Sequence, residues 1–557
     1  MKMIFNLMGW GRVGVGSLVA LLALASCSDD WDSHYAPSTG DATSLWESIS
    51  QESSVSNFAK VLKAADFDRK LSGSQAYTVF ALTNDALSAS QADSLVEAYQ
   101  TQKAAGVRDN DNTVVRQFIQ NHISLYRHPV STQTNDSIKM MNGKYAVLTP
   151  TSVGGNPFVV TNQLHSNGVL FTVNNRVKYF PNVFEYLGID HDLDSVFRFI
   201  NSFSDYEFVE SASVPGGIVD GQTVYLDSVM QMRNNILNLL GYINSEDSTY
   251  WMLAPTNAEW SRMVTAYRPY YNYANTVANR DSMQETNTRL AILLGTVFSR
   301  TVNPEPAFRD SALSTSALSY QYRRMLNADP YYIFYHPFEA NGIFAGTRSL
   351  ECSNGSVLKT ADFRIDKRNT FLQTIKVEAE NLVRQDTIID AEQPLEVHTV
   401  QSGNAFYDKL SGNQFVELIA SNTSADPNHF PYPTVMYSVP DVLANVGYDI
   451  YVVMAPVQAY NPYAADADTL PNKILCNLYY NNQDNKLQQR RLGVSVSTPG
   501  KVDTIKVAGN FKFPICSYGL SQPNVRLRIQ SQVGRNETAK YSTNMRLDCI
   551  IFKPTEE

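Results

Sequence analysis

The sequence predicts a multidomain protein in which two α+β domains are followed by an all-β sandwich. One pattern of helices and strands occurs twice within the first two-thirds of the chain. From about residue 373 the helical spacing of apolar residues ends, and short strands separated by turns replace it. A short apolar segment near the start adds a leader to these three domains.

The leader is too short to cross a membrane. Its apolar run, residues 18–25, falls far below the roughly 20 apolar residues that a spanning helix needs. Basic residues before the run and small residues after it are typical of a secretory signal. The sequence LASC, which ends at Cys27, resembles the lipobox of bacterial lipoproteins. This resemblance implies that residues 1–26 are removed, and that lipidation of Cys27 anchors the protein to a membrane. The alternative is a chance cysteine after an ordinary signal peptide.

The residues directly after Cys27 point to a location. Ser28, Asp29 and Asp30 resemble the acidic signal that exports lipoproteins of Bacteroidetes to the outer face of the outer membrane. The resemblance implies an outer-membrane protein that faces the cell exterior, with residues 27–42 as a tether. The alternative is that these residues only keep the tether solvated.

Composition excludes several classes of function. A net charge of −9 argues against nucleic acid as a partner. The chain lacks the G-x-S-x-G, P-loop and HExxH patterns, and no G-x-G-x-x-G follows a predicted strand, so we expect no enzyme. Four cysteines remain besides Cys27, and none forms a CxxC pair, which argues against a structural zinc site. We expect buried thiols, three of them on strands, and a disulfide stays open: Cys352, Cys476, Cys516 and Cys549.

The repeated pattern is a helical run, an apolar strand that ends in Thr-Asn, and a second helical run. The strand reads YTVFALTNDA at residues 77–86 and YWMLAPTNAE at residues 250–259. We expect the Thr or Asn to cap the next helix. Asn-Gly at 167–168 and 354–355 predicts a tight turn, because both residues tolerate positive φ. Apolar residues spaced i, i+3, i+4, i+7 before each strand predict a helix with one buried face: Phe58, Val61, Leu62, Ala65 and Leu193, Val196, Phe197, Ile200.

These landmarks resemble the fasciclin domain. The strand of residues 78–86 is similar to its "TVFAPTNEAF" signature, and residues 167–173 are similar to "NGVIHVID". His122 matches a mid-domain His that is mainly a core residue in that family, although a binding role is the alternative. We expect fasciclin-like domains at 43–183 and 184–372, the second of which lacks the His. The resemblance implies helices packed on a sheet, and adhesion or partner binding instead of catalysis.

The last third predicts a β-sandwich or jelly roll. It opens with IKVEAEN at residue 375 and closes with MRLDCIIF at residue 545. These ends resemble galactose-binding-like jelly rolls found among carbohydrate-binding modules, so we expect such a domain at 373–557. The predicted strands are Phe415–Ile419, Val435–Val439, Tyr448–Met454, Ile474–Tyr480, Leu492–Val496, Val507–Phe513, Val525–Ile529 and Leu547–Phe552.

Three carboxylates near the ends of this domain are candidate calcium ligands. Glu378 and Glu380 are two residues apart on a predicted strand, so both face one side. Asp548 lies on the last strand. Hard oxygen ligands suit calcium, and the resembled modules hold a structural calcium at these positions. The alternative is a set of surface carboxylates on an edge strand.

Tyrosines in predicted loops are candidates for glycan binding, which normally combines aromatic faces with a few polar groups. The domain contains no Trp, so the usual stacking residue is missing. The alternative is that these loops pack against the sandwich. The candidates are Tyr407, Tyr432, Tyr460 and Tyr463.

Together these features predict a non-catalytic cell-surface binding lipoprotein. The preferred interpretation is an accessory glycan-binding or docking component of a Sus-like nutrient-uptake system. Its partners would be the membrane through the lipid anchor, a polysaccharide and Sus-like outer-membrane transporter proteins. Two alternatives stay open: an adhesin that binds host or neighbouring-cell protein, and a structural subunit of an outer-membrane transporter complex.

Overall fold

A computed structural model describes residues 43–555 with gaps at 213, 220, 228–229, 300–309, 318–328 and 466–468. The predicted leader and tether, with Cys27, Ser28, Asp29 and Asp30, lie outside the described residues. The chain divides into two compact units, 1–179 and 180–557. Within the described ranges, no helix combines the length and the apolar character needed to cross a membrane.

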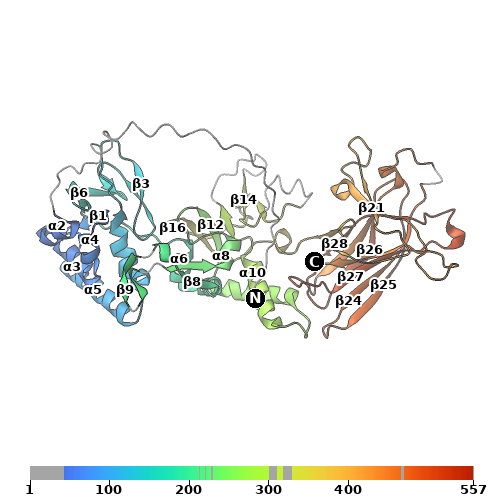
Figure 1. The fold of residues 1–557 in the computed structure, drawn as a ribbon, viewed down its shortest axis with the longest axis horizontal. Helices are drawn as coiled ribbons and strands as arrows, with labels where there is room; N and C mark the ends of the chain where they lie inside the picture. Colours follow the sequence, from blue (N-terminus) through green and yellow to red (C-terminus); the bar gives the residue numbers. More distant parts are fainter. Residues whose placement is uncertain are drawn as a thin grey trace. The chain divides into compact units, whose positions relative to one another are not determined.

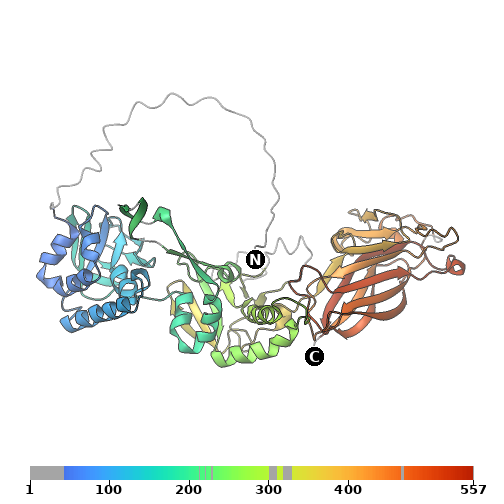
Figure 2. The same cartoon turned by 60° about the horizontal axis from the view of Figure 1, so that its bottom comes forward.

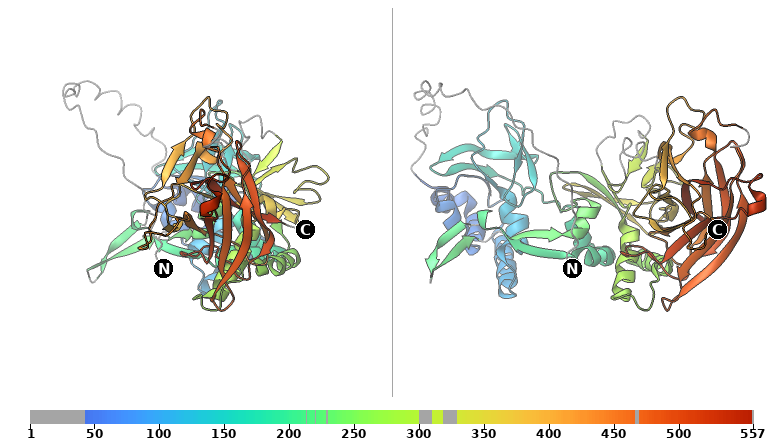
Figure 3. Two further views of the ribbon diagram at one scale, coloured as in Figure 1. Left: turned by 90° about the vertical axis from the view of Figure 1, so that its right-hand side faces the viewer. Right: turned by 45° about the vertical axis from the view of Figure 1, so that its right-hand side comes forward.

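The first unit is an α+β domain in which helices pack on a sheet of seven strands (Figure 1, Figure 3). The strand order is β2-β1-β7-β6-β5-β4-β3, and β1 pairs in parallel with β7. Its strands are β1 (Tyr77–Leu82), β2 (Ile123–Leu125), β3 (Asp136–Lys139), β4 (Tyr145–Leu148), β5 (Ser152–Val153), β6 (Asn156–His165) and β7 (Gly168–Val173). Its helices are α2 (Leu45–Gln51), η1 (Ser53–Val55), α3 (Ser56–Ala64), α4 (Phe67–Ser72), α5 (Ala89–Ala104), η2 (Asp109–Asp111), η3 (Val115–Ile119) and η4 (Gln120–His122).

The predicted buried face of the first helical run is confirmed, whereas the second helical run differs from the prediction. Phe58, Val61 and Leu62 on α3 are buried in the core, as the i, i+3, i+4 spacing requires. The second run is not a regular α-helix, because residues 115–119 form a π-helix that tightens into the 3-10 turn η4. This change of pitch ends at His122, which enters the core directly before β2.

The Asn of each Thr-Asn pair caps an earlier helix, which corrects our expectation. Asn84 Oδ1 accepts a hydrogen bond from the backbone N–H of Asn57, in the first turn of α3. Asn257 does the same for Ser195 in the second unit. Only Thr256 behaves as predicted, since its hydroxyl accepts from the N–H of Glu259 in the helix that follows.

The Asn-Gly pairs form turns, but the physical reason differs from the prediction. Neither Asn adopts positive φ. Asn167 is buried, and its side chain accepts from the N–H of Leu45 and donates to the carbonyls of Leu71 and Gly73. Gly168 is required because a Cβ there would lie 2.1 Å from the carbonyl oxygen of Tyr77, on the neighbouring strand. The pair therefore joins the helices to the sheet.

The second unit begins with a smaller copy of the same arrangement. Its four-stranded sheet has the order β13-β12-β17-β16, and β12 pairs in parallel with β17 as β1 does with β7. Leu193 on η5 and Val196 and Ile200 on α7 are buried as predicted, whereas Phe197 is only partly buried. The helices are α6 (Val183–Ile189), η5 (His191–Leu193), α7 (Asp194–Asn201), η6 (Glu210–Ala212), α8 (Asn235–Leu240), α9 (Asn257–Tyr267), η7 (Arg268–Tyr271), α10 (Arg280–Leu293) and η9 (Lys367–Asn369). The strands are β8 (Ser204–Phe208), β9 (Val214–Val219), β10 (Gln222–Asp227), β11 (Met230–Asn234), β12 (Tyr250–Pro255), β13 (Val297–Ser299), β14 (Ser311–Leu313), β15 (Ile333–Tyr335), β16 (Arg348–Cys352) and β17 (Gly355–Thr360).

The remainder of the second unit is an all-β sandwich of two sheets (Figure 2). One sheet has the order β20-β21-β28-β23-β26, with β18 also paired to β28, and the other has the order β19-β22-β27-β24-β25. All eight predicted strands are confirmed, and the short polar strands β19 and β20 were missed. The strands are β18 (Ile375–Glu378), β19 (Gln385–Ile389), β20 (Glu396–Thr399), β21 (Gln414–Leu418), β22 (Thr434–Val439), β23 (Gly447–Met454), β24 (Lys473–Asn481), β25 (Leu487–Val496), β26 (Asp503–Lys512), β27 (Val525–Ser531) and β28 (Met545–Thr555). The described residues of the sandwich also form the 3-10 turns η10 (Ser411–Asn413), η11 (Val457–Ala459) and η13 (Arg535–Glu537).

The sandwich and the α+β part before it share one hydrophobic cluster within the second unit. Tyr271 lies edge-on to Tyr518, with ring centroids 5.6 Å apart. The hydroxyl of Tyr273 donates to the carbonyl of Tyr518, and Asn272 donates to Gln483. The sequence boundary near residue 373 is thus bridged by packing and hydrogen bonds.

Candidate functional site

Two of the three predicted calcium ligands, Glu378 and Asp548, lie together where the first and last strands of the sandwich meet. Glu378 at the end of β18 pairs with Cys549 on β28, which brings Asp548 close to it. Ser411 in the turn η10 binds both carboxylates. Its hydroxyl donates to Glu378 Oε1 at 2.6 Å, and its backbone N–H donates to Asp548 Oδ1 at 3.1 Å. Glu378 and Asp548, with Cys549, offer atoms within 4.8 Å of one another. Glu380 lies beyond the end of β18 and outside this group.

The electrostatics of this cluster fit a divalent cation. Burial, with the charges of Glu378 and Glu380, raises the pKa of Asp548 to about 8. Burial also raises the pKa of Glu380. Glu378 Oε2 and Glu380 Oε2 are buried without a hydrogen-bond partner among the described residues. Lys376 Nζ, 3.5 Å from Glu378 Oε1, offers one compensating charge. Hard oxygens that are desolvated and mutually repelling form the donor set that Ca²⁺ takes.

A hollow of about 450 Å³ lies at the loops of the sandwich and contains two of the four predicted tyrosines. Tyr463 is 95% exposed, and Tyr460 and Phe406 also line the hollow. Three amide residues also line the hollow, Gln401, Asn404 and Gln458, of which Asn404 donates to the carbonyls of Gln458 and Ala459. Aromatic faces next to amide groups are the combination that a sugar site needs.

A buried network of charged side chains contacts Tyr460, one of the residues that line this hollow. The ring of Tyr460 stacks on His398, with centroids 4.0 Å apart. His398 Nε2 lies 3.0 Å from Glu417 Oε2, and Arg546 Nη1 donates to Glu417 Oε1 at 3.2 Å. Burial raises the pKa of Glu417, but His398 and Arg546 outweigh it and hold this pKa below its ordinary value. The network fixes Tyr460, and its members come from three strands and could not be paired from the sequence.

The other two predicted tyrosines lie elsewhere. Tyr407 is 40% exposed but does not line the hollow. Tyr432 is half-buried, its N–H donates to Asp390 Oδ2, and its ring lies edge-on to Phe430. The four tyrosines therefore do not form one surface: Tyr407 follows the hollow-lining Phe406 without lining the hollow itself, and Tyr432 belongs to another segment.

His122 is a core residue of the first unit. It is fully buried, and Nδ1 lies 2.7 Å from the carbonyl oxygen of Phe118. Nε2 accepts from the N–H of Val177 at 3.1 Å, so the neutral ring satisfies both partners. Burial lowers the pKa of His122 to about 4. These contacts support the structural role of this His.

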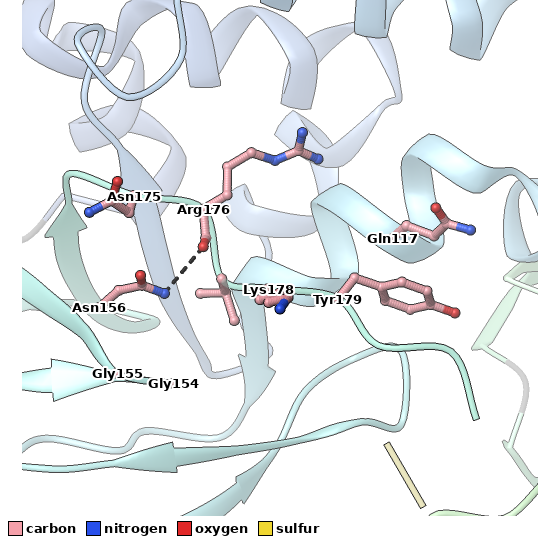
Figure 4. Close-up of a pocket in the computed structure, with 9 residues that line it drawn as sticks. Gln117, Gly154, Gly155, Asn156, Asn175, Arg176, Lys178 and Tyr179 are labelled. Carbon is pink, nitrogen blue, oxygen red and sulfur yellow. Dashed lines mark hydrogen bonds between the residues drawn. The ribbon is translucent and has the colours of Figure 1, made fainter. Parts of the chain in front are cut away.

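A second hollow, of about 520 Å³, lies in the first unit (Figure 4), and one of its lining residues, Val177, donates its N–H to His122. It is bounded by the turn Gly154–Asn156 and by residues 175–179. Asn156 Nδ2 donates to the carbonyl of Arg176, whose side chain points away from Asn156 (Figure 4). The guanidinium of Arg176 lies over the Phe118 ring at 4.7 Å. No motif in the sequence marks these residues as a site.

The four cysteines within the described ranges carry free thiols. Cys476 and Cys549 are buried on strands, as predicted. Cys516 is also buried but follows β26 in a loop, contrary to the expected strand position. Burial raises the pKa of Cys476 and Cys516 to about 12, as for inert core thiols.

Solved structures that resemble this chain include adhesion and carbohydrate-binding proteins. The FAS1 domain pair of the insect cell adhesion molecule Fasciclin I is 11% identical, with 57% of this chain and 98% of that chain covered and a TM-score of 0.19. The CBM22-2 xylan-binding domain of Paenibacillus barcinonensis Xyn10C is 10% identical, with 33% and 99% covered and a TM-score of 0.19. The K1 cleaved adhesin domain of Lys-gingipain from Porphyromonas gingivalis W83 is 15% identical, with 33% and 99% covered and a TM-score of 0.17.

Among curated proteins, no sequence matches the chain. The family model described as the fasciclin domain matches residues 53–177. This segment contains the seven-stranded sheet, the Thr-Asn strand and buried His122. Residues 53–177 are therefore a fasciclin domain.

Proposed function

We propose that this chain is a non-catalytic, lipid-anchored lipoprotein of the outer cell surface that binds glycan through its sandwich. It would act as an accessory component of a Sus-like nutrient-uptake system, beside the transporter proteins of that system. The two fasciclin-like parts would serve as spacer and docking surface. The fasciclin match supports a binding or adhesion role for the first unit.

The hollow at Tyr460 and Tyr463 carries the proposal. An almost fully exposed aromatic ring normally costs free energy in water, and here Tyr463 stands beside amide groups that can bind hydroxyls. Tyr460 is held in place by His398, so part of the site is preorganised before a ligand arrives. We therefore assign glycan stacking to Tyr463 and Tyr460.

Calcium would have a structural role. Glu378 and Asp548 would hold it and tie the first strand of the sandwich to the last, with the charge of Glu380 nearby. The same ion would also fix the turn at Ser411, which leads into β21 and thus to Glu417. Glycan binding would depend on calcium only through the stability of the sandwich.

A glycan array tests this proposal with the full chain and two tyrosine variants. We expect Tyr463→Ala to lose the glycans that the wild type retains, because the stacking face is removed. Tyr407→Ala is the matched control, since Tyr407 is an exposed tyrosine of the same domain that lies outside the hollow. Equal loss in both variants, or no retained glycan at all, would reject the site. If the full chain binds outer-membrane transporter proteins but no glycan, the structural-subunit alternative is favoured. If it binds host protein instead, the adhesin is favoured.

The anchor is tested separately by labelling cells with a clickable fatty acid. Cys27→Ala should lose the label, while Cys352→Ala should keep it. Protease treatment of intact cells should digest the wild type, and replacement of Asp29 and Asp30 by Ala should protect it. A label that persists in Cys27→Ala contradicts the lipid anchor.

A further inference from the structure

The outer face of the sheet β19-β22-β27-β24-β25 carries arginines that no motif marked. Tyr437, Leu527 and Leu478 point into the core, so residues of alternate positions point outward. The strand register places two rows of outward residues across this face. One row is Thr387, Met436, Arg528, Asn477 and Arg491, and the other contains Ser438, Arg526, Tyr479 and Gln489.

Two of the three guanidinium groups on this face lack a partner. Arg526 Nε lies 2.5 Å from Asp386 Oδ2, which is the carboxylate of the face. Arg528 and Arg491 form no ion pair or hydrogen bond with any described residue. The Nε of Arg528 is buried and unsatisfied, which is costly for a charged group unless another molecule supplies the acceptor. The face is therefore positive, on a chain whose net charge is −9.

The same face is hollowed and partly apolar. A depression of about 540 Å³ is lined by Met436, Tyr479, Thr387 and both Arg526 and Arg528. Five strands at about 4.8 Å spacing span roughly 19 Å, which suits an extended chain better than a single small anion. Neutral hydrogen-bonding groups, Asn477 and Gln489, lie on the rows beside the arginines.

We propose that this arginine face, defined by Arg491, Arg526, Arg528, Met436 and Tyr479, binds a polysaccharide that carries carboxylate groups, such as a uronate polymer. The planar guanidinium of Arg528 would receive a carboxylate, because the two groups match in a pair of parallel hydrogen bonds. Tyr479 would contact a sugar ring, and the amides would bind hydroxyls. This site goes beyond the proposed function, since it shares no residue with the hollow at Tyr463 and takes a charged ligand.

Affinity electrophoresis of the full chain in gels that contain polygalacturonate or alginate tests the proposal. Wild type is expected to be retarded by the uronate polymer and much less by the same polymer after carboxyl reduction. Arg528→Gln should weaken retardation by about tenfold to a hundredfold, the range for a lost charge-assisted hydrogen bond. Because the Arg528 side chain forms no ion pair or hydrogen bond with any described residue, this variant should melt as the wild type does. Arg491→Gln, an exposed position, provides a second variant.

Arg490→Gln is the matched control, because Arg490 is exposed on the same strand but pairs with inward-facing Leu478. It should leave retardation unchanged, and so should Tyr463→Ala, which separates this site from the loop hollow. Equal loss in Arg490→Gln and Arg528→Gln would overturn the proposal. So would retardation by polyglutamate or single-stranded DNA as strong as by the uronate polymers, or no retardation by either uronate polymer.

Discussion

The buried His122 predicts how acid unfolds the fasciclin domain. The pKa of a solvated His is 6.5, and burial lowers that of His122 to about 4. Between these values the unfolded chain binds a proton at this position and the folded domain does not. Proton uptake by the unfolded chain therefore lowers the free energy of unfolding of the domain. The stability is fully present above pH 6.5 and is lost as the pH falls toward 4. Because one pKa unit corresponds to about 1.4 kcal/mol, the loss approaches roughly 3 kcal/mol.

The variant His122→Gln isolates this effect from that of the carboxylates. Gln offers one donor and one acceptor and does not titrate, so it should be less stable than the wild type at pH 7 but should lack this pH dependence. The assay is calorimetry of the full chain between pH 7 and pH 4, with the transition of the first unit identified by the variant. Wild type should lose about 3 kcal/mol more than His122→Gln over this range. Parallel pH profiles for the two proteins would refute the account of His122.

Three further predictions concern stability. Calcium added after chelation should raise the melting temperature of the full chain, and magnesium should raise it less. Asp548→Asn should abolish the calcium-induced shift. If calcium does not shift the melting temperature of the wild type, these carboxylates do not bind calcium. Glu417→Gln leaves buried Arg546 without its counter-charge and should cost about 3 kcal/mol, whereas Glu396→Gln, more than half exposed, should stay within about 0.5 kcal/mol; comparable losses would contradict the role of the network. Gly168→Ala places a Cβ 2.1 Å from the carbonyl oxygen of Tyr77 and should lower the free energy of unfolding by about 3 kcal/mol. The control Gly73→Ala places its Cβ 3.4 Å from the nearest atom and should leave stability nearly unchanged. An unchanged stability of Gly168→Ala would show that the two strands can move apart.

The fold class could be predicted because its signals are local. The apolar alternation of β22, β24 and β27 and the spacing on α3 each lie within one short segment, and burial follows them closely. The proximity of Glu378 and Asp548 was also predictable, because the resemblance places the first and last strands side by side. Strands β19 and β20 were not predicted because they are short and lack a clear apolar alternation. Their strand structure depends on pairing with β22 and β21.

The sites built across strands could not be predicted. Arg526, Tyr479 and Arg491 belong to the three strands β27, β24 and β25, and only the register of the sheet places them on one face. His398 and Arg546 meet at Glu417 for the same reason. Asn167 was interpreted as a turn residue, although its side chain joins α2 and α4 to the sheet. In each case the sequence shows the residue type and the tertiary structure decides the partner.

The central claim, a glycan site at Tyr460 and Tyr463, is tested most directly by calorimetric titration of the full chain with the glycan best retained on the array. Wild type and Tyr407→Ala should bind with the same affinity, and Tyr463→Ala should bind at least tenfold more weakly, because the aromatic face contributes about 1.4 kcal/mol or more. The glycan should be recovered at its original length, as expected for a binding protein. Equal affinity of Tyr463→Ala and wild type, or a shortened glycan, would contradict the account.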